Sequence, residues 1–202
     1  MEENENEVVM EGGNGTGNSN VKKIVIAIVC LIAAILVIVG IVNATKSTPE
    51  KTVEQFIKNM DNKKASKVID QMDIVGLAAF YACDGDYEDF NDNYEDYKEE
   101  YDDLDKEDIE DQIDTMVESL QDYFDNLDKF KVEIKTIKSA KKVKDAKNLY
   151  KVNAKIKTEV KEDKDDDTEK DTSTIDFYVY KKSGKYYIVG MDTKSGDGLD
   201  LF

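Results

Sequence analysis

Histidine, tryptophan and arginine are absent from this chain of 202 residues, and proline occurs only once. Histidine is the commonest general base near neutral pH, and arginine is the side chain that grips phosphates and carboxylates through two parallel hydrogen bonds. All 28 basic residues are therefore lysines, within a formal net charge of -17. These absences disfavour most enzymes and nucleic-acid-binding proteins, so no catalytic residue, no cofactor and no nucleic-acid partner is predicted.

Cysteine is scarce as well. The two cysteines cannot form a disulfide framework, because Cys30 lies within a long apolar run and Cys83 lies outside it. The residues before Cys30 do not match a lipobox, so Cys30 is interpreted as a small packing residue. Cysteine usage leaves the redox compartment open.

A long apolar run is the strongest feature near the N-terminus. Ile24 to Val42 comprises 19 residues without a charge, and a helix of that length spans roughly 30 Å, the thickness of the hydrocarbon core. The run predicts a single transmembrane helix in a lipid bilayer. The alternative is a signal peptide cleaved after Ala44, but the apolar region of a signal peptide is only about 7 to 15 residues long.

Lysines beside this run indicate its orientation. Lys22 and Lys23 abut its N-terminal side, so the positive-inside rule places residues 1–23 in the cytoplasm. That tail is rich in Glu, Asn and Gly and is predicted to be disordered, because it has too few apolar residues to bury a core. Residues 24–42 then form the transmembrane helix, residues 43–48 a linker, and residues 49–202 a domain outside the membrane.

The domain opens with helical signals. Thr48-Pro49-Glu50 supplies an N-cap, a proline at the first helical position and an acid in the first turn. Apolar residues then recur three and four positions apart from Val53 to Met60, and two further short apolar stretches end at Met72 and Tyr81. Three short helices are predicted.

An acidic tract follows, and its apolar residues have helical spacing. They are separated by 3, 4, 3, 4 and 3 positions, which places Tyr87, Phe90, Tyr94, Tyr97, Tyr101 and Leu104 on one face. The same spacing resumes from Ile109 to Leu127. The tract is therefore predicted to form a long acidic helical hairpin with two antiparallel helices.

A calcium loop is the alternative interpretation of the same tract. Counted from Asp84, acids occupy several of the positions that bind calcium in an EF-hand, up to Glu95 at position 12. However, the sixth position of that loop requires glycine for its sharp turn, and here it is Asp89. Such matches arise by chance in a tract this acidic, so no metal site is predicted.

From Phe130 onwards the apolar residues alternate with polar ones, as in half-buried strands. Strands are predicted near residues 130–134, 150–160, 173–181 and 185–191, with Ser183-Gly184 turning the chain between the last two. The fold class is therefore α+β, with helices over about 49–128 packed on a four-stranded antiparallel meander over about 130–191.

Charge is segregated between these two halves of the domain. Residues 84–128 contain 21 acids against two lysines, whereas residues 129–161 contain 12 lysines against three acids. Six of the lysines are predicted to share one face of the sheet: Lys131, Lys135, Lys151, Lys155, Lys157 and Lys161. Either they form a solvated face that offsets the acidic half, or they form a surface for an anionic partner.

One stretch runs from Ser47 to Phe56 and continues from Asn62 to Asp70, and another runs from Tyr178 to Val189, where Ser183-Gly184-Lys185 precedes an aromatic strand. Both stretches resemble membrane-anchored bacterial domains of the nuclear-transport-factor-2-like superfamily. The resemblance implies a cone of helices on a curved antiparallel sheet, with a pocket between them, in the envelope of Gram-positive bacteria. It implies no catalytic residues, and the acidic hairpin departs from it.

The favoured function is a noncatalytic, single-pass envelope protein of the bacterial cytoplasmic membrane. Its outer domain is expected to bind a partner protein or an anionic envelope polymer. The alternative is an enzyme or ligand-binding protein that uses the implied pocket, with Asp70 or Asp73 as the carboxylate and Tyr81 as a hydrogen-bond donor. A sensor is disfavoured because the cytoplasmic tail is too short for an output domain. The identity of the ligand and the oligomeric state stay open.

Overall fold

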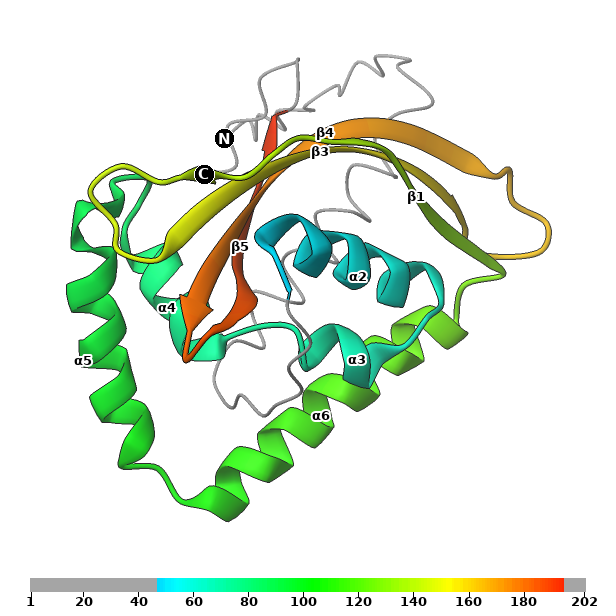
Figure 1. Ribbon diagram of the computed structural model, residues 1–202. Helices are drawn as coiled ribbons and strands as arrows, with labels where there is room; N and C mark the ends of the chain where they lie inside the picture. The colour runs from blue at the N-terminus through cyan, green and yellow to red at the C-terminus, as the bar shows by residue number, and fades with distance from the viewer. Residues whose placement is uncertain (1–46, 195–202) are drawn as a thin grey trace, which may run out of the picture.

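A computed structural model describes residues 47–194 of the chain, and the predicted cytoplasmic tail and transmembrane helix lie outside this range. Within residues 47–194 there is no helix of the length and apolar character that crossing a membrane requires. The described part consists of helices packed on an antiparallel sheet (Figure 1), so the predicted α+β class is confirmed.

The first three helices are α2 (Pro49–Asp61), α3 (Ala65–Ile69) and α4 (Ile74–Ala82). The predicted N-cap is present, because the Thr48 side chain accepts a hydrogen bond from the Lys51 backbone N–H at 3.3 Å. Asp73 caps α4 in the same way, through the N–H of Gly76. These caps explain why the chain divides into short helices at these points.

The sheet is the predicted meander with one small addition. Its strands are β1 (Lys129–Ile137), β3 (Leu149–Lys161), β4 (Glu169–Lys182) and β5 (Lys185–Lys194), hydrogen-bonded in the order β1-β3-β4-β5 with every neighbouring pair antiparallel. The two-residue strand β2 (Lys141–Lys142) pairs with β3 as well. Figure 1 shows the sheet arching over α2.

Helix α2 covers the edge of the sheet at β1. Two of its acids accept backbone N–H groups from that side: Asp61 from Val132 at 2.8 Å, and Glu50 from Ala140 at 2.7 Å. Open strand edges invite pairing with other chains, so these contacts protect the edge. The hydrogen bond from Ala140 also lowers the pKa of the Glu50 carboxyl.

Apolar cores lie on both faces of the sheet. Alternate residues of β4 show this, because Phe177 and Val179 pack in one cluster with α2, α3 and α6, whereas Tyr178 and Tyr180 pack in a second cluster with α4 and α5. The acidic tract forms part of both clusters, as η1 (Tyr87–Asp89), α5 (Phe90–Asp102) and α6 (Lys106–Asp125).

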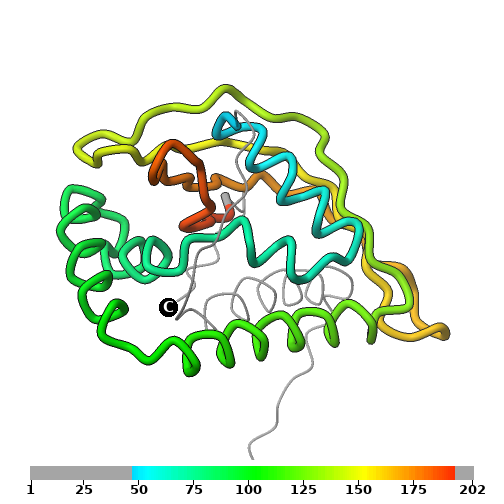
Figure 2. Tube along the Cα trace, turned by 60° about the horizontal axis from the view of Figure 1, so that its bottom comes forward, coloured from blue at the N-terminus to red at the C-terminus, as the bar shows by residue number. Residues whose placement is uncertain are grey.

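The predicted antiparallel hairpin is wrong in its packing, although both of its helices form. Figures 1 and 2 show α5 and α6 diverging from the turn that joins them. Phe90 and Tyr94 of α5 contact Tyr180 of the sheet, while Met116 and Leu120 of α6 join the core around α2 and α3. Each helix therefore buries its apolar face against a different part of the domain rather than against the other helix.

Candidate functional site

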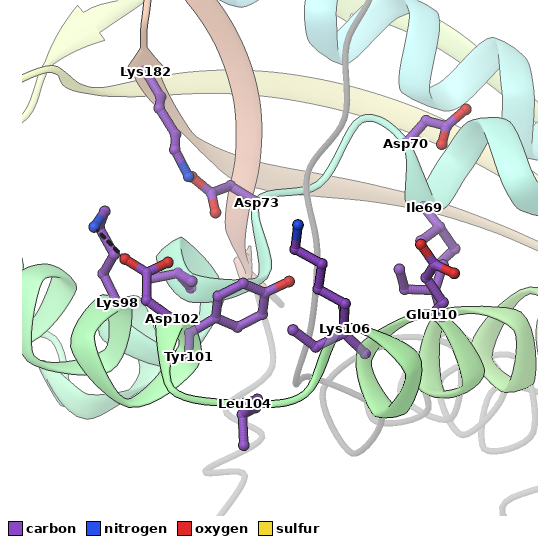
Figure 3. Close-up of a pocket in the computed structure, with 13 residues that line it drawn as sticks. Ile69, Asp70, Asp73, Lys98, Tyr101, Asp102, Leu104, Lys106, Glu110 and Lys182 are labelled. Carbon is purple, nitrogen blue, oxygen red and sulfur yellow. Dashed lines mark hydrogen bonds and ion pairs between the residues drawn. The ribbon is translucent and has the colours of Figure 1, made fainter.

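The space between the two diverging helices contains a pocket of about 550 Å³. The segment from Ile69 to Val75 lines it on one side, and α5, α6, the loop between them and the end of β4 line the others (Figure 3). Clefts that bind small molecules usually enclose about 300 to 1,000 Å³. The size of this pocket falls within that range.

Much of the lining is apolar. Ile69, Val75 and Ile109 are buried, with 4%, 7% and 7% of their surface exposed. Ile113 and Tyr101 are half-buried, and Leu104, at the turn between α5 and α6, is 41% exposed. The pocket thus has a buried apolar floor and an exposed apolar rim at Leu104.

Asp73 is the most buried charged group of the pocket, with 3% of its surface exposed. One oxygen caps α4, and the other accepts the Tyr94 hydroxyl of α5 at 2.9 Å. The Lys182 ammonium lies 3.6 Å from that second oxygen and 5.5 Å from the centre of the Tyr94 ring. Burial, and then the negative charge of Asp73, raises the pKa of the Tyr94 hydroxyl, so this hydroxyl stays a hydrogen-bond donor.

The other charged groups differ in their pairing. Lys98 and Asp102 form an ion pair at 2.6 Å on the surface of α5. Among the described residues, Lys106, Asp70 and Glu110 make no ion pair and no side-chain hydrogen bond. Figure 3 shows Lys106 extending from α6 towards Asp73 and Lys182, and Glu110 lying further along α6 beside Ile69. The pocket therefore offers one ammonium group and two carboxylates that a ligand can meet.

Tyr101 adds a neutral polar group between these charges. Figure 3 places its ring between Asp102 and Lys106. Burial, followed by the charges of Asp102 and Asp73, raises its pKa to about 12. The phenol is therefore protonated at neutral pH and can donate one hydrogen bond.

The structure brings together two of the three residues predicted for a pocket. Asp70 and Asp73 both line it, whereas Tyr81 lies at the end of α4, 42% exposed, with its ring against Phe80. Tyr94 is the hydroxyl that meets Asp73. Apolar spacing alone does not predict this pairing, because Tyr81 and Tyr94 both occupy helical positions with that spacing.

The six lysines predicted to share a face are largely paired with carboxylates of the domain. Lys151 lies 3.3 Å from buried Asp176, and Lys157 lies 2.6 Å from Glu159, which Lys129 also contacts. The remaining pairs join Lys135 to Glu133 and Lys161 to Asp128. Lys131 stands opposite Glu159 and Lys155 opposite Thr174, and a bulge between Ile134 and Thr136 takes Lys135 out of register.

The ion pairs of Glu159 lower the pKa of its carboxyl group. Hydrogen bonds from Lys129 and Lys157 lower its pKa from 4.5 to about 2. The carboxylate is therefore ionised at all physiological pH values and neutralises part of the basic face.

Residues 47–194 contain no group of three or more Cys, Asp or Glu side chains arranged to hold a metal ion. In the tract that was considered as a calcium loop, Asp86 instead caps η1 through the Glu88 N–H, and α5 begins at Phe90. Residues 90–95, the second half of the twelve-residue loop, are therefore helical.

Comparisons with known proteins show distant likenesses only. No family model matches the chain, and no curated protein matches it. One similar solved structure is a designed nuclear-transport-factor-2-like protein, Rd1NTF2_05, at 12% identity and a TM-score of 0.36 over 71% of this chain and 93% of that one. Another is the intermembrane space region of the chloroplast protein ARC6, at 10% identity and a TM-score of 0.32 over 73% and 97%. At TM-scores this low, membership in either family does not follow.

Proposed function

We propose that this chain is a noncatalytic ligand-binding protein of the bacterial envelope. Ile24 to Val42 anchors it in the cytoplasmic membrane, and the domain from residue 49 onwards lies outside, as in the membrane-anchored domains that its sequence resembles. The pocket between α5 and α6 is the observation that carries the proposal, because it combines buried apolar side chains with charges that lack partners among the described residues.

A binding role fits this pocket better than catalysis does. A general base needs a carboxylate that is free to take a proton from a substrate. The most buried carboxylate of the pocket, Asp73, is instead held by the α4 N-terminus, the Tyr94 hydroxyl and the Lys182 ammonium. These contacts of Asp73 join three elements of the fold, which indicates a structural role. The other predicted carboxylate, Asp70, is unpaired among the described residues but exposed to solvent, so it lies outside the apolar surroundings that tune a catalytic carboxylate.

The pocket is also favoured over the basic face of the sheet as the binding surface. Acids of the domain already lie within 4 Å of Lys135, Lys151, Lys157 and Lys161. An anionic polymer would have to compete with these acids, and contacts between exposed charges are weak and screened by salt.

The proposal is tested with the full-length protein in lipid nanodiscs. Ligand-detected NMR against a fragment library should identify apolar and amphiphilic fragments that bind the wild type. Ile113→Trp adds bulk to the pocket lining and should abolish their binding, while Tyr81→Trp, at an exposed site away from the pocket, should not. Circular dichroism establishes that both variants fold. Fragments that bind the Ile113→Trp variant as well as the wild type would locate binding elsewhere.

Anionic polymer binding is the second candidate, supported by two exposed lysines. Lys131 and Lys155 have no ion pair among the described residues, so they are the members of the basic face that are available to a polymer. If Lys131 and Lys155 bind the polymer, the protein should co-sediment with purified wall material at low salt. Replacing both with Glu, or adding salt to about 0.3 M, should release it. Absence of sedimentation at low salt rejects this candidate.

A further inference from the structure

We infer that the pocket between α5 and α6 binds a short apolar peptide with a free ammonium group at one end and a free carboxylate at the other. This inference rests on the proposed binding function and adds the chemical class of the ligand. It follows from the distribution of charge, the apolar floor and the size of the pocket.

Groups of both signs are available to a ligand. Lys106 and Glu110 are four residues apart on α6, a spacing at which opposite charges often pair. Nevertheless, they form no ion pair in the described part of the chain, and Asp70 forms none either. Figure 3 shows Lys106 extending into the middle of the pocket and Glu110 beside Ile69. A carboxylate can therefore meet Lys106 while an ammonium group meets Glu110 or Asp70.

A ligand with a single charge fits less well. Both helices that form the pocket belong to residues 84–128, which contain 21 acids and two lysines, so their field repels an anion. A simple cation would meet the ammonium group of Lys106, which has no ion pair among the described residues, and would leave it without a counter-charge. A molecule that carries both charges and no net charge avoids either repulsion and meets a partner at each end.

The floor of the pocket requires an apolar middle. Ile69, Val75 and Ile109 line it and are buried, so a polar ligand would lose water there without gaining hydrogen bonds. Tyr101 is the exception, because its protonated hydroxyl can donate to a peptide carbonyl. An apolar peptide supplies both features along one chain.

Size sets the length of the peptide. A volume of about 550 Å³ corresponds to roughly 18 water molecules at about 30 Å³ each in the liquid. That is roughly the number of non-hydrogen atoms in a peptide of two or three small apolar residues. A single amino acid would leave much of the pocket empty.

The test is isothermal titration of full-length protein in nanodiscs with four forms of the tripeptide Leu-Ala-Leu. One form has free termini, one is N-acetylated, one is C-amidated, and one is blocked at both ends. We expect the free form to bind at least tenfold more tightly than either singly blocked form. Lys106→Gln should weaken the free form about tenfold and leave the amidated form unchanged, because the amidated form lacks the carboxylate that Lys106 would bind.

Matched variants complete the test. The double variant with Asp70→Asn and Glu110→Gln should weaken the free form and leave the acetylated form unchanged. Lys138→Gln removes the same charge as Lys106→Gln at an exposed site outside the pocket and should change nothing.

The possible failures are distinguishable. Equal binding of the free and doubly blocked forms overturns the zwitterionic ligand and leaves an apolar binding pocket, so the proposed function stands. If no form of the tripeptide binds, the inference is wrong. The fragments that bind the wild type but not the Ile113→Trp variant then decide whether the pocket binds any ligand. If the Ile113→Trp variant loses no fragment that the wild type binds, the proposed function fails as well.

Discussion

At the scale of single residues, Asp73 holds three parts of the domain together. Its carboxylate caps α4, accepts the hydroxyl of Tyr94 on α5, and lies 3.6 Å from Lys182 at the end of β4. The backbone N–H of Asp73 also donates to Ile188 of β5 at 3.0 Å. A buried charge is tolerated only when it is hydrogen-bonded in this way. Asp73 thereby fixes one wall of the pocket.

Removing the carboxylate should destabilise the domain. Asp73→Ala loses a helix cap and leaves the buried Tyr94 hydroxyl without its acceptor, so we expect the free energy of unfolding to fall by about 3 kcal/mol. Tyr94→Phe removes only the hydrogen bond to the charged group and should cost about 1.5 kcal/mol. Urea unfolding followed by circular dichroism measures both changes. The control is Tyr97→Phe at an exposed position, and an equal effect of the two Tyr→Phe changes would contradict this role of Asp73.

Glu159 should make stability depend on pH in the acid range. Its pKa is about 2 in the folded domain and 4.5 without these contacts, so the unfolded chain takes up its proton first as the pH falls. The stabilisation is therefore complete above pH 4.5 and is lost progressively towards pH 2. Other carboxylates titrate here too, so the difference between the wild type and Glu159→Gln is the relevant quantity.

Thermal unfolding measured between pH 5 and pH 2 tests this difference. The melting temperature of Glu159→Gln should lie below that of the wild type at pH 5 and approach it near pH 2. Glu118→Gln, at an exposed position of α6, should keep the wild-type profile. A constant difference between wild type and Glu159→Gln across this range would show that the ion pairs are absent in solution.

At the scale of elements, the separation of α5 and α6 creates the pocket. Helix α5 packs on α4 and on the aromatic end of β4, whereas α6 packs on α3 and the core around α2. Both helices keep their acids towards solvent. Had the two helices packed against each other, Tyr101 and Ile109 would be covered and no pocket would remain between them.

The aromatic face of α5 should therefore stabilise the domain unevenly along its length. Phe90 is fully buried, but Tyr97 is 37% exposed. Phe90→Ala should lower the free energy of unfolding by about 3 kcal/mol or more, because a large buried ring leaves a cavity. Tyr97→Ala should cost less than about 1 kcal/mol. Urea unfolding separates the two, and equal losses would indicate the paired hairpin that the spacing predicts.

Across the whole molecule, acidic and basic residues occupy different parts of the fold. The acidic helices lie beside the pocket, while three of the four β3 lysines that face the same side, Lys151, Lys157 and Lys161, are paired with acids of the sheet and with Asp128. A membrane-anchored domain of this kind would present the pocket outside the cell. That placement depends on the apolar run from Ile24 to Val42.

The orientation of the chain in the membrane can be measured directly. Intact protein should sediment with the membrane fraction. Protease added to whole cells should digest the chain beyond residue 43, because the positive-inside rule predicts that the lysine pair before the apolar run keeps the N-terminus inside. A tag at the N-terminus should stay protected under the same conditions. Soluble protein that begins at Thr45 would instead establish cleavage after Ala44.

Local patterns in the sequence predict the helices and strands and their order along the chain. Spacing of three and four residues located the helices, alternation located the four main strands, and Thr48-Pro49 located the start of α2. Helical and extended backbones present their side chains with different periods, so the spacing of apolar residues indicates the conformation of each segment. The meander followed because short turns join neighbouring antiparallel strands.

Which surfaces of these elements meet depends on long-range packing, and local patterns do not predict it. Periodicity identifies the apolar face of a helix but not its neighbour, so α5 and α6 were predicted to pack together when each in fact packs elsewhere. For the same reason, of the pocket residues Asp70, Asp73 and Tyr81 that the resemblance suggested, Tyr81 lies elsewhere. Tyr94, Lys182 and Lys106 were missed, because they come from three other elements. The partners of the sheet lysines depend on strand register, which sets Lys157 beside Glu159 and Lys151 beside Asp176. These contacts join residues far apart in the chain, and local spacing carries no information about them.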